Sequence, residues 1–150
     1  MHYFLLVVVL IILDQFTKYL IQSNMDLNQT VPVIEGIFHI TYIHNYGAAF
    51  SILQGQQMFF ILVTGVAVIL ILLYLNRKRK SGHPCLLLSL ACIAGGGIGN
   101  LINRITTGYV VDFLDFRVWP IFNVADISVT CGCGLLIIYM FFLEQRVMKE

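Results

Sequence analysis

Two aspartates in strongly apolar surroundings are the residues of this sequence best suited to do chemistry. Asp112 lies within the apolar stretch 110–113, and Asp126 follows 14 positions later, at the end of the stretch 122–126. An ionised carboxylate near hydrocarbon costs roughly 2.5–3.5 kcal/mol, so an acid in such a place is expected to have a function. If the two carboxyls converge, like-charge repulsion makes them share a proton. One could then activate water while the other polarises a carbonyl, as in an aspartic protease.

The same two aspartates also have a purely structural interpretation. Asp112 could be a solvated loop acid, and Asp126 could cap a helix, because helix N-termini favour negative charge by about 0.3–1 kcal/mol. Spacing alone does not decide between the two interpretations. Asp115 is a rival loop acid, but Arg117 lies two positions on and could neutralise it. We therefore expect a surface role for Asp115.

A possible ion pair lies in the first apolar stretch. Asp14 and Lys18 are four positions apart, which places them on one face of a helix in the favourable order for an i,i+4 pair. Lys18 could extend outward to water along its aliphatic stem. We expect a structural role for the pair, tying this helix to the loops; contact with a substrate is the alternative.

Amides and an arginine form a further group of polar candidates. Asn100 and Arg104 are also four positions apart, at the end of an apolar stretch. Arg104 could clamp a carboxylate, a carbonyl or a lipid phosphate, and Asn100 and Asn123 could hydrogen-bond a peptide backbone. An interfacial arginine with capping amides is the alternative. Asn45 lies in a polar and small-residue segment that by itself predicts only a turn.

The elements that must position these residues are membrane helices. Hydrophobic residues make up 59% of the chain and charged residues 11%, against about 45–50% and 25% in soluble domains. Four stretches have the length of about 20 residues that spans a bilayer core; they cover about 3–22, 57–76, 84–102 and 124–143. The sequence therefore predicts one all-α integral membrane domain, residues 1–150, with four transmembrane helices and no role in nucleic-acid binding.

The connections between the spans differ in character. The predicted outer loops are 23–56 and 103–123, and the predicted cytoplasmic loop is 77–83. Residues 30–44 are rich in β-branched and aromatic side chains, which favours short strands. We expect a small extracytoplasmic sheet there, followed at 47–51 by a half-helix that dips toward the bilayer.

Charge sets the predicted orientation. Six of the nine basic residues fall in the link between the second and third spans or in the C-terminal tail; they are Arg77, Lys78, Arg79, Lys80, Arg146 and Lys149. Because basic residues concentrate on the cytoplasmic side, both termini are predicted to be cytoplasmic. Six of the eight acidic residues, Asp112 and Asp126 among them, then belong to the extracytoplasmic side.

Other kinds of active site find little support in the sequence. The four cysteines and four histidines show no spacing typical of a metal site, so we expect no metal and no cofactor. A serine protease would need a serine and histidine pair within the spans. A small transporter or channel, with Asp14, Lys18, Asp112 and Asp126 as a relay, would need polar residues through the full membrane depth, whereas these gather toward the outer side.

Five motifs, taken together, resemble those of bacterial lipoprotein signal peptidase (signal peptidase II) in the same order. They occupy residues 14–18, 45–50, 99–104, 110–113 and 122–126. The resemblance spans essentially the whole chain. It implies an aspartyl endopeptidase of the bacterial inner or plasma membrane that removes signal peptides from diacylglyceryl-modified prolipoproteins, cutting before the lipidated cysteine.

The resemblance also implies roles for particular residues. Asp112 and Asp126 match the catalytic pair of the family, and Asp14 and Lys18 match its supporting polar pair. Positions that bind the substrate backbone or support the catalytic pair are matched by Asn45, Asn100, Arg104 and Asn123. The β-cradle and half-helix of the family match the expectation for residues 30–51. Its partners would be lipid-modified prolipoproteins and membrane lipid, and we expect a monomer.

One position departs from the family pattern. Asn103 stands where the family usually has an aspartate before the arginine. Asparagine keeps the shape and an acceptor but loses the charge, so no salt bridge is expected at Asn103.

Overall fold

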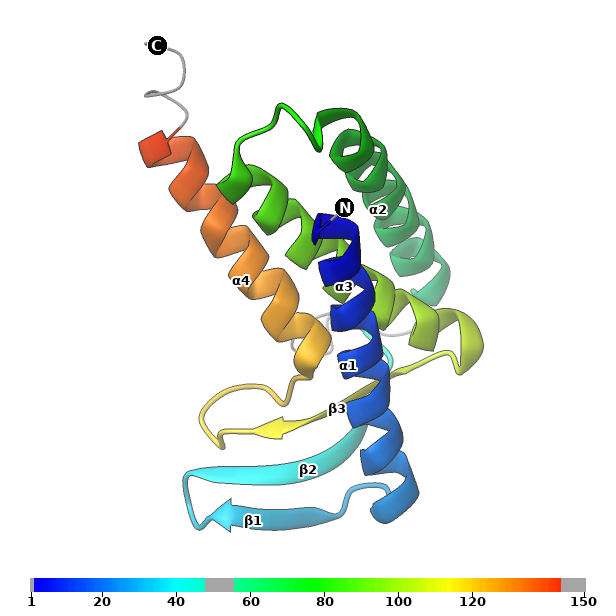
Figure 1. Ribbon diagram of the computed structural model, residues 1–150. Helices are drawn as coiled ribbons and strands as arrows, with labels where there is room; N and C mark the ends of the chain where they lie inside the picture. The colour runs from blue at the N-terminus through cyan, green and yellow to red at the C-terminus, as the bar shows by residue number, and fades with distance from the viewer. Residues whose placement is uncertain (1, 48–55, 144–150) are drawn as a thin grey trace.

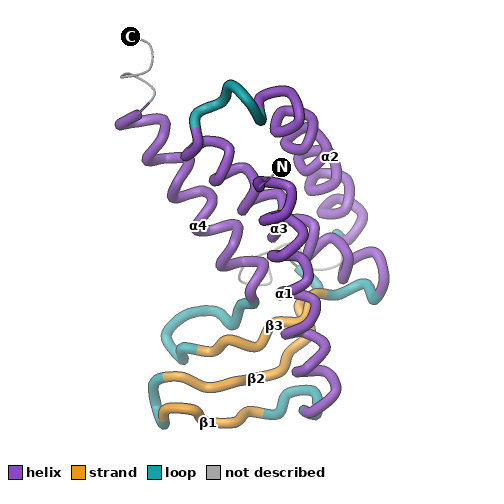
Figure 2. The backbone as a smooth tube through the Cα atoms, in the orientation of Figure 1, coloured by secondary structure: helices purple, strands orange, loops and turns teal. Residues whose placement is uncertain are grey.

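The computed structural model describes residues 2–47 and 56–143 as four long helices and a small sheet (Figures 1 and 2). The helices are α1 (His2–Asn24), α2 (Gln57–Lys78), α3 (Pro84–Thr106) and α4 (Val124–Ile138), which a π-helix, Tyr139–Leu143, extends. All four are long and apolar enough to cross a membrane. The predicted fold class is thereby confirmed; most of the expected half-helix at 47–51 lies outside the described residues.

The sheet lies at one end of the bundle (Figure 1). Its strands β1 (Thr30–Ile34), β2 (Phe38–Asn45) and β3 (Val110–Asp115) pair antiparallel in the order β1-β2-β3. The β1–β2 turn includes Gly36 at φ +74°, a conformation that glycine adopts without steric cost. The expectation of strands within 30–44 is confirmed.

The third strand corrects the expectation of a loop over residues 103–123. Residues 110–115 form β3 and pair with β2, with Ile43 opposite Asp112 and Asn45 opposite Val110. Two adjacent valines favour a strand, but pairing with a segment some 70 positions earlier is a tertiary event. As a result, Asp112 is held on a strand instead of lying in a solvated loop.

Helix α3 is central to the bundle because it packs against α1, α2 and α4. Small residues allow this close packing. A Cβ atom added to Gly96 would clash with the carbonyl oxygen of Ala125 on α4, and one added to Gly99 would lie 2.6 Å from Oδ2 of Asp14 on α1. Between the helices, a core cluster contains Val7, Leu75, Leu87, Ala91 and Ala94. The outward faces of α1 and α2 expose large apolar side chains, as expected for lipid contact.

Candidate active site

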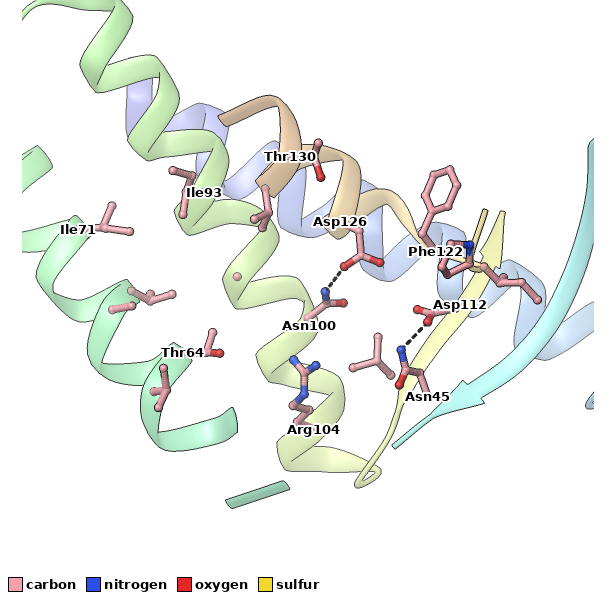
Figure 3. A pocket seen from close by; sticks show the side chains of 18 of the residues that line it. Asn45, Thr64, Ile71, Ile93, Asn100, Arg104, Asp112, Phe122, Asp126 and Thr130 are labelled. Atoms are coloured by element: carbon pink, nitrogen blue, oxygen red, sulfur yellow. Dashed lines mark hydrogen bonds between the residues drawn. The ribbon is translucent and has the colours of Figure 1, made fainter. Parts of the chain in front are cut away.

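The two aspartates reach one pocket from two different elements (Figure 3). Asp112 lies on β3 and is 2% exposed. Asp126 is the third residue of α4, and both side chains line the same pocket. The connection between β3 and α4 folds back on the strand, where Phe122 forms a β-bridge with Leu114. The two carboxyl groups, which come from different elements, therefore face the same pocket.

Three asparagines hold the two carboxyl groups. Asn45 donates to Oδ2 of Asp112 at 2.8 Å, and Asn123 donates to its Oδ1 at 2.6 Å. Asn100 donates to Oδ1 of Asp126 at 2.8 Å. Each carboxyl is thus oriented by amide donors from other elements, which leaves lone pairs for water or substrate.

Asn123 also begins the helix that carries Asp126. Its side chain accepts a hydrogen bond from the Asp126 backbone N–H at 3.0 Å, while Oδ2 of Asp126 accepts one from the Asn123 N–H at 3.1 Å. This reciprocal capping box satisfies two N–H groups of the helix end. The capping interpretation of Asp126 is therefore correct, and it coexists with a place in the pocket.

The environment of Asp112 changes its proton affinity. Burial, and secondly the nearby charge of Asp126, raise the pKa of Asp112 to about 7, although hydrogen bonds from Asn45 and Asn123 act in the opposite direction. Desolvation has this effect because it disfavours the charged form. Near neutral pH the pair can therefore hold one proton between its two members.

Asp14 and Lys18 form the predicted ion pair, at 2.8 Å, but both side chains are buried inside the helix bundle. Lys18 is 1% exposed and donates to Oδ1 of Asn100 at 2.8 Å, so its extension outward to water was a wrong expectation. Asp14 accepts from the Ala125 backbone N–H at 3.0 Å. The pair therefore ties α1 to α3 and α4 instead of to the loops, because the partners of the buried ammonium and carboxylate are Asn100 and the Ala125 N–H.

Gln15 belongs to the same network, and in the sequence only its place beside Asp14 in the motif 14–18 distinguishes it. Its Nε2 lies 3.0 Å from Oδ2 of Asp14, 3.0 Å from the Gly99 carbonyl oxygen and 3.4 Å from Oδ1 of Asn103. Asn103 is buried, and its neutral amide oxygen accepts the hydrogen bond from Gln15.

Arg104 extends from α3 into the pocket (Figure 3). Its Nη2 donates to the Gly47 carbonyl oxygen at 3.2 Å, and its guanidinium lies 5.2 Å from the centre of the Phe60 ring. Its Nε is buried and has no hydrogen-bond partner within the described part of the chain. A donor directed into a pocket without a partner is available to an acceptor on a ligand.

Asp115 does not have the expected surface role. It is 4% exposed and accepts hydrogen bonds from Oγ1 of Thr41 at 2.8 Å and from the backbone N–H of Arg117 at 2.8 Å. The expected neutralisation by Arg117 is confirmed, at 3.2 Å. Burial tends to raise the pKa of Asp115, but these hydrogen bonds hold it below its usual value. Asp115 is a structural acid that joins β2 to β3, outside the pocket.

The pocket has a volume of about 480 Å³ and two chemically different ends. The aspartates, Asn45, Asn100 and Arg104 lie at the sheet end (Figure 3). The remainder runs between α2, α3 and α4 and is lined mainly by apolar side chains: Val63, Ala67, Val68, Ile71, Ile93 and Val129. Such a space can accept an extended apolar ligand whose polar part lies at the carboxyls.

The chain is similar to signal peptidases of bacteria. The family model for signal peptidase (SPase) II matches residues 6–142. A lipoprotein signal peptidase of Halothermothrix orenii is 46% identical over 142 residues, covering 95% of this chain and 97% of that protein. One from Brevibacillus brevis is 48% identical over 143 residues, covering 94% and 95%.

Solved structures show the same fold. A bacterial membrane enzyme solved by the in meso method at 2.3 Å resolution aligns with a TM-score of 0.86 and 36% identity, covering 93% of this chain and 87% of that one. A second, solved at 1.9 Å, aligns with a TM-score of 0.84 and 35% identity, covering 95% and 94%. The helices and sheet described above are therefore similar to those of membrane enzymes.

Proposed function

This chain belongs to the signal peptidase II family, and we propose that it removes signal peptides from diacylglyceryl-modified prolipoproteins, cutting before the lipidated cysteine. Curated relatives that align with nearly all of the chain are lipoprotein signal peptidases. The chain is a multi-pass membrane peptidase by family and by its four long apolar helices.

Asp112 and Asp126 would act as an aspartyl dyad sharing one proton. The ionised carboxylate takes a proton from a water molecule as the water oxygen attacks the scissile carbonyl carbon. The protonated carboxyl donates its hydrogen bond to the carbonyl oxygen. Collapse of the tetrahedral intermediate passes a proton to the leaving nitrogen, and the dyad returns to its one-proton state. General acid–base catalysis of this kind contributes about 10²- to 10⁴-fold.

The other polar residues of the pocket would position the dyad and the substrate. Asn45, Asn100 and Asn123 hold the carboxyls by hydrogen bonds of 2.6–2.8 Å, and positioning of this kind accelerates a reaction by restricting the reactants to productive geometry. Arg104 has a donor free to bind a substrate carbonyl or a lipid phosphate. Apolar parts of the substrate would lie along the helices.

The proposed orientation follows from charge. With the segment 77–80 cytoplasmic, the sheet and both carboxyls belong to the extracytoplasmic side of the bacterial inner or plasma membrane, and both termini are cytoplasmic. A signal peptide that crosses the membrane would then present its cleavage site at the depth of the dyad. We propose that one copy of the chain suffices, since both aspartates come from the same chain.

The observation that carries this proposal is that two carboxyls, the buried Asp112 on β3 and the half-buried Asp126 on α4, line one partly apolar pocket. The test is cleavage of a diacylglyceryl-modified prolipoprotein peptide by the purified protein in detergent. Asp112→Asn and Asp126→Asn should each lose at least about 100-fold in kcat/KM while melting like the wild type.

Asp115→Asn is the matched control, because this acid lies on the same strand but outside the pocket. It should cut at a rate close to that of the wild type. Normal cleavage by either dyad variant would refute the aspartyl mechanism, and a folded wild type that leaves this peptide intact would refute the substrate.

A further inference from the structure

A cluster of positive charge lies at the end of the bundle opposite the sheet. The basic segment, residues 77–80, ends α2 and begins the loop to α3, which lies away from the three strands (Figure 1). All four side chains are exposed. Within the described ranges none of them takes part in an ion pair, since the two ion pairs there are Asp14–Lys18 and Asp115–Arg117. Four cations close together thus lack an anionic partner in this part of the chain.

The helix dipole explains the position of only two of these four cations. Arg77 and Lys78 lie in the last turn of α2, where cations interact favourably with the helix dipole. Arg79 and Lys80 lie beyond that turn. The loop that carries them is held in place, because the N–H groups of Ser81 and Gly82 donate to the Lys78 carbonyl oxygen at 3.0 and 2.7 Å.

An apolar groove lies between α2 and α3 next to the basic segment. It has a volume of about 320 Å³ and is lined by Leu70, Ile71, Tyr74, Leu86 and Leu90. These positions are in the last three turns of α2 and the first two of α3. At 1.5 Å per residue, Tyr74 lies about 6 Å farther from the loop than Lys78. The groove therefore runs into the bilayer core from the level of the charges.

We propose that this groove and the basic segment together bind one anionic phospholipid. An acyl chain would lie in the groove between α2 and α3, and the phosphate would lie among the cations, chiefly Arg79 and Lys80. Charge complementarity selects the headgroup, since each Lys or Arg near an anionic lipid surface is worth about 1 kcal/mol. The lining selects a hydrocarbon chain, because all five of its residues present apolar surface.

This site is separate from the pocket that holds the aspartates. Ile71 lies between the two and lines both, whereas Leu70 lines only the groove. Leu70 is 60% exposed on the outer face of α2. A larger side chain at position 70 can therefore obstruct the groove without disturbing the bundle core. The lipid site can be tested by binding alone, without reference to cleavage.

The experiment measures lipid retention by native mass spectrometry of the full-length protein from mixed micelles. Dioleoylphosphatidylglycerol and dioleoylphosphatidylcholine are supplied in equal amounts. Wild type should retain one phosphatidylglycerol in preference to phosphatidylcholine. Arg79→Gln/Lys80→Gln should reduce this preference about fivefold for each charge removed, while Arg79→Lys/Lys80→Arg should preserve it.

A second pair of variants tests the groove itself. Leu70→Trp should reduce phosphatidylglycerol retention, whereas Leu73→Trp should not, because Leu73 is equally exposed, at 62%, but does not line the groove. Equal retention by these two variants would overturn the site and leave only a surface charge effect. So would a wild type without preference for phosphatidylglycerol, or displacement of the lipid by soluble glycerol 1-phosphate.

Discussion

Asn123 donates a hydrogen bond of 2.6 Å to Oδ1 of Asp112 from the capping position of the helix that carries Asp126. One side chain therefore fixes the start of α4 with its oxygen and orients the carboxyl on β3 with its nitrogen. The two functions use different atoms, so they can be separated by substitution.

Asn123→Ser keeps an oxygen that can cap α4 but removes the donor to Asp112. Serine and asparagine are comparable N-caps, so the start of α4 should be preserved, while loss of the amide donor lowers kcat/KM for the lipid-modified peptide at least about tenfold. Asn123→Ala, which lacks both groups, should in addition lose about 1 kcal/mol of stability. Equal activity of Asn123→Ser and wild type would show that the donor to Asp112 is not needed.

The raised pKa of Asp112 predicts how stability depends on pH. The folded protein holds this proton up to about pH 7, whereas the usual value for the carboxyl is 3.8. Asp112 therefore contributes most to stability below about pH 4, and this contribution declines as pH rises to 7. Relative to Asp112→Asn, the wild type should lose up to about 4 kcal/mol over that range, at 1.36 kcal/mol per pKa unit.

Thermal unfolding of both proteins in detergent between pH 4 and pH 8 checks this prediction. Wild-type cleavage should also decline above about pH 7, as the dyad loses its shared proton. Parallel stability curves for wild type and Asp112→Asn would contradict the shifted pKa.

The buried ion pair on α1 should be costly to break from one side. Lys18→Met leaves the Asp14 carboxylate without its cation, and Asp14 is 0% exposed. Breaking a buried pair in this way typically costs about 3–5 kcal/mol. Asp14→Asn/Lys18→Met, which removes both charges, should recover much of that loss. Chemical denaturation in micelles measures the three proteins, and a single variant as stable as the double would refute the argument.

The contact between α3 and α4 depends on the absence of a side chain at Gly96. A Cβ atom there would clash with the Ala125 carbonyl oxygen, which does not move without its helix. We expect Gly96→Ala to lower stability by about 1–3 kcal/mol through overpacking. Gly134→Ala, on α4, is the control, because a Cβ there meets nothing within 4 Å. If both variants melt like the wild type, the close packing is not a constraint.

Much of the fold was predictable because the bilayer imposes it. A segment in hydrocarbon must satisfy its own backbone hydrogen bonds, so about 20 apolar residues in succession specify a helix. The candidate site was predictable for a related reason, since polar residues in apolar stretches are costly and stand out. Asp112, Asp126, Asn100 and Arg104 were found in this way, and all four line one pocket.

Position and pairing were less predictable. The valines of residues 110–115 favour a strand but do not reveal which strand it pairs with, because strand pairing depends on a partner distant in sequence. Lys18 was expected to reach water and instead reaches Asn100. Asp115 was expected at the surface and is buried against Thr41. In each case the sequence shows which polar group is present but does not reveal which distant residue it contacts.

By itself, then, the sequence determined that this protein lies in a membrane, how many long helices it has and which residue types are available for chemistry. These properties follow from composition and from the length of the apolar stretches along the chain. Only the tertiary structure decided which carboxyls line the same pocket. Asp112 and Asp126 converge because β3 pairs with β2, α4 packs on the glycines of α3, and Asn123 links the strand to the helix. These are contacts between distant segments, whose geometry depends on the packing of the whole chain.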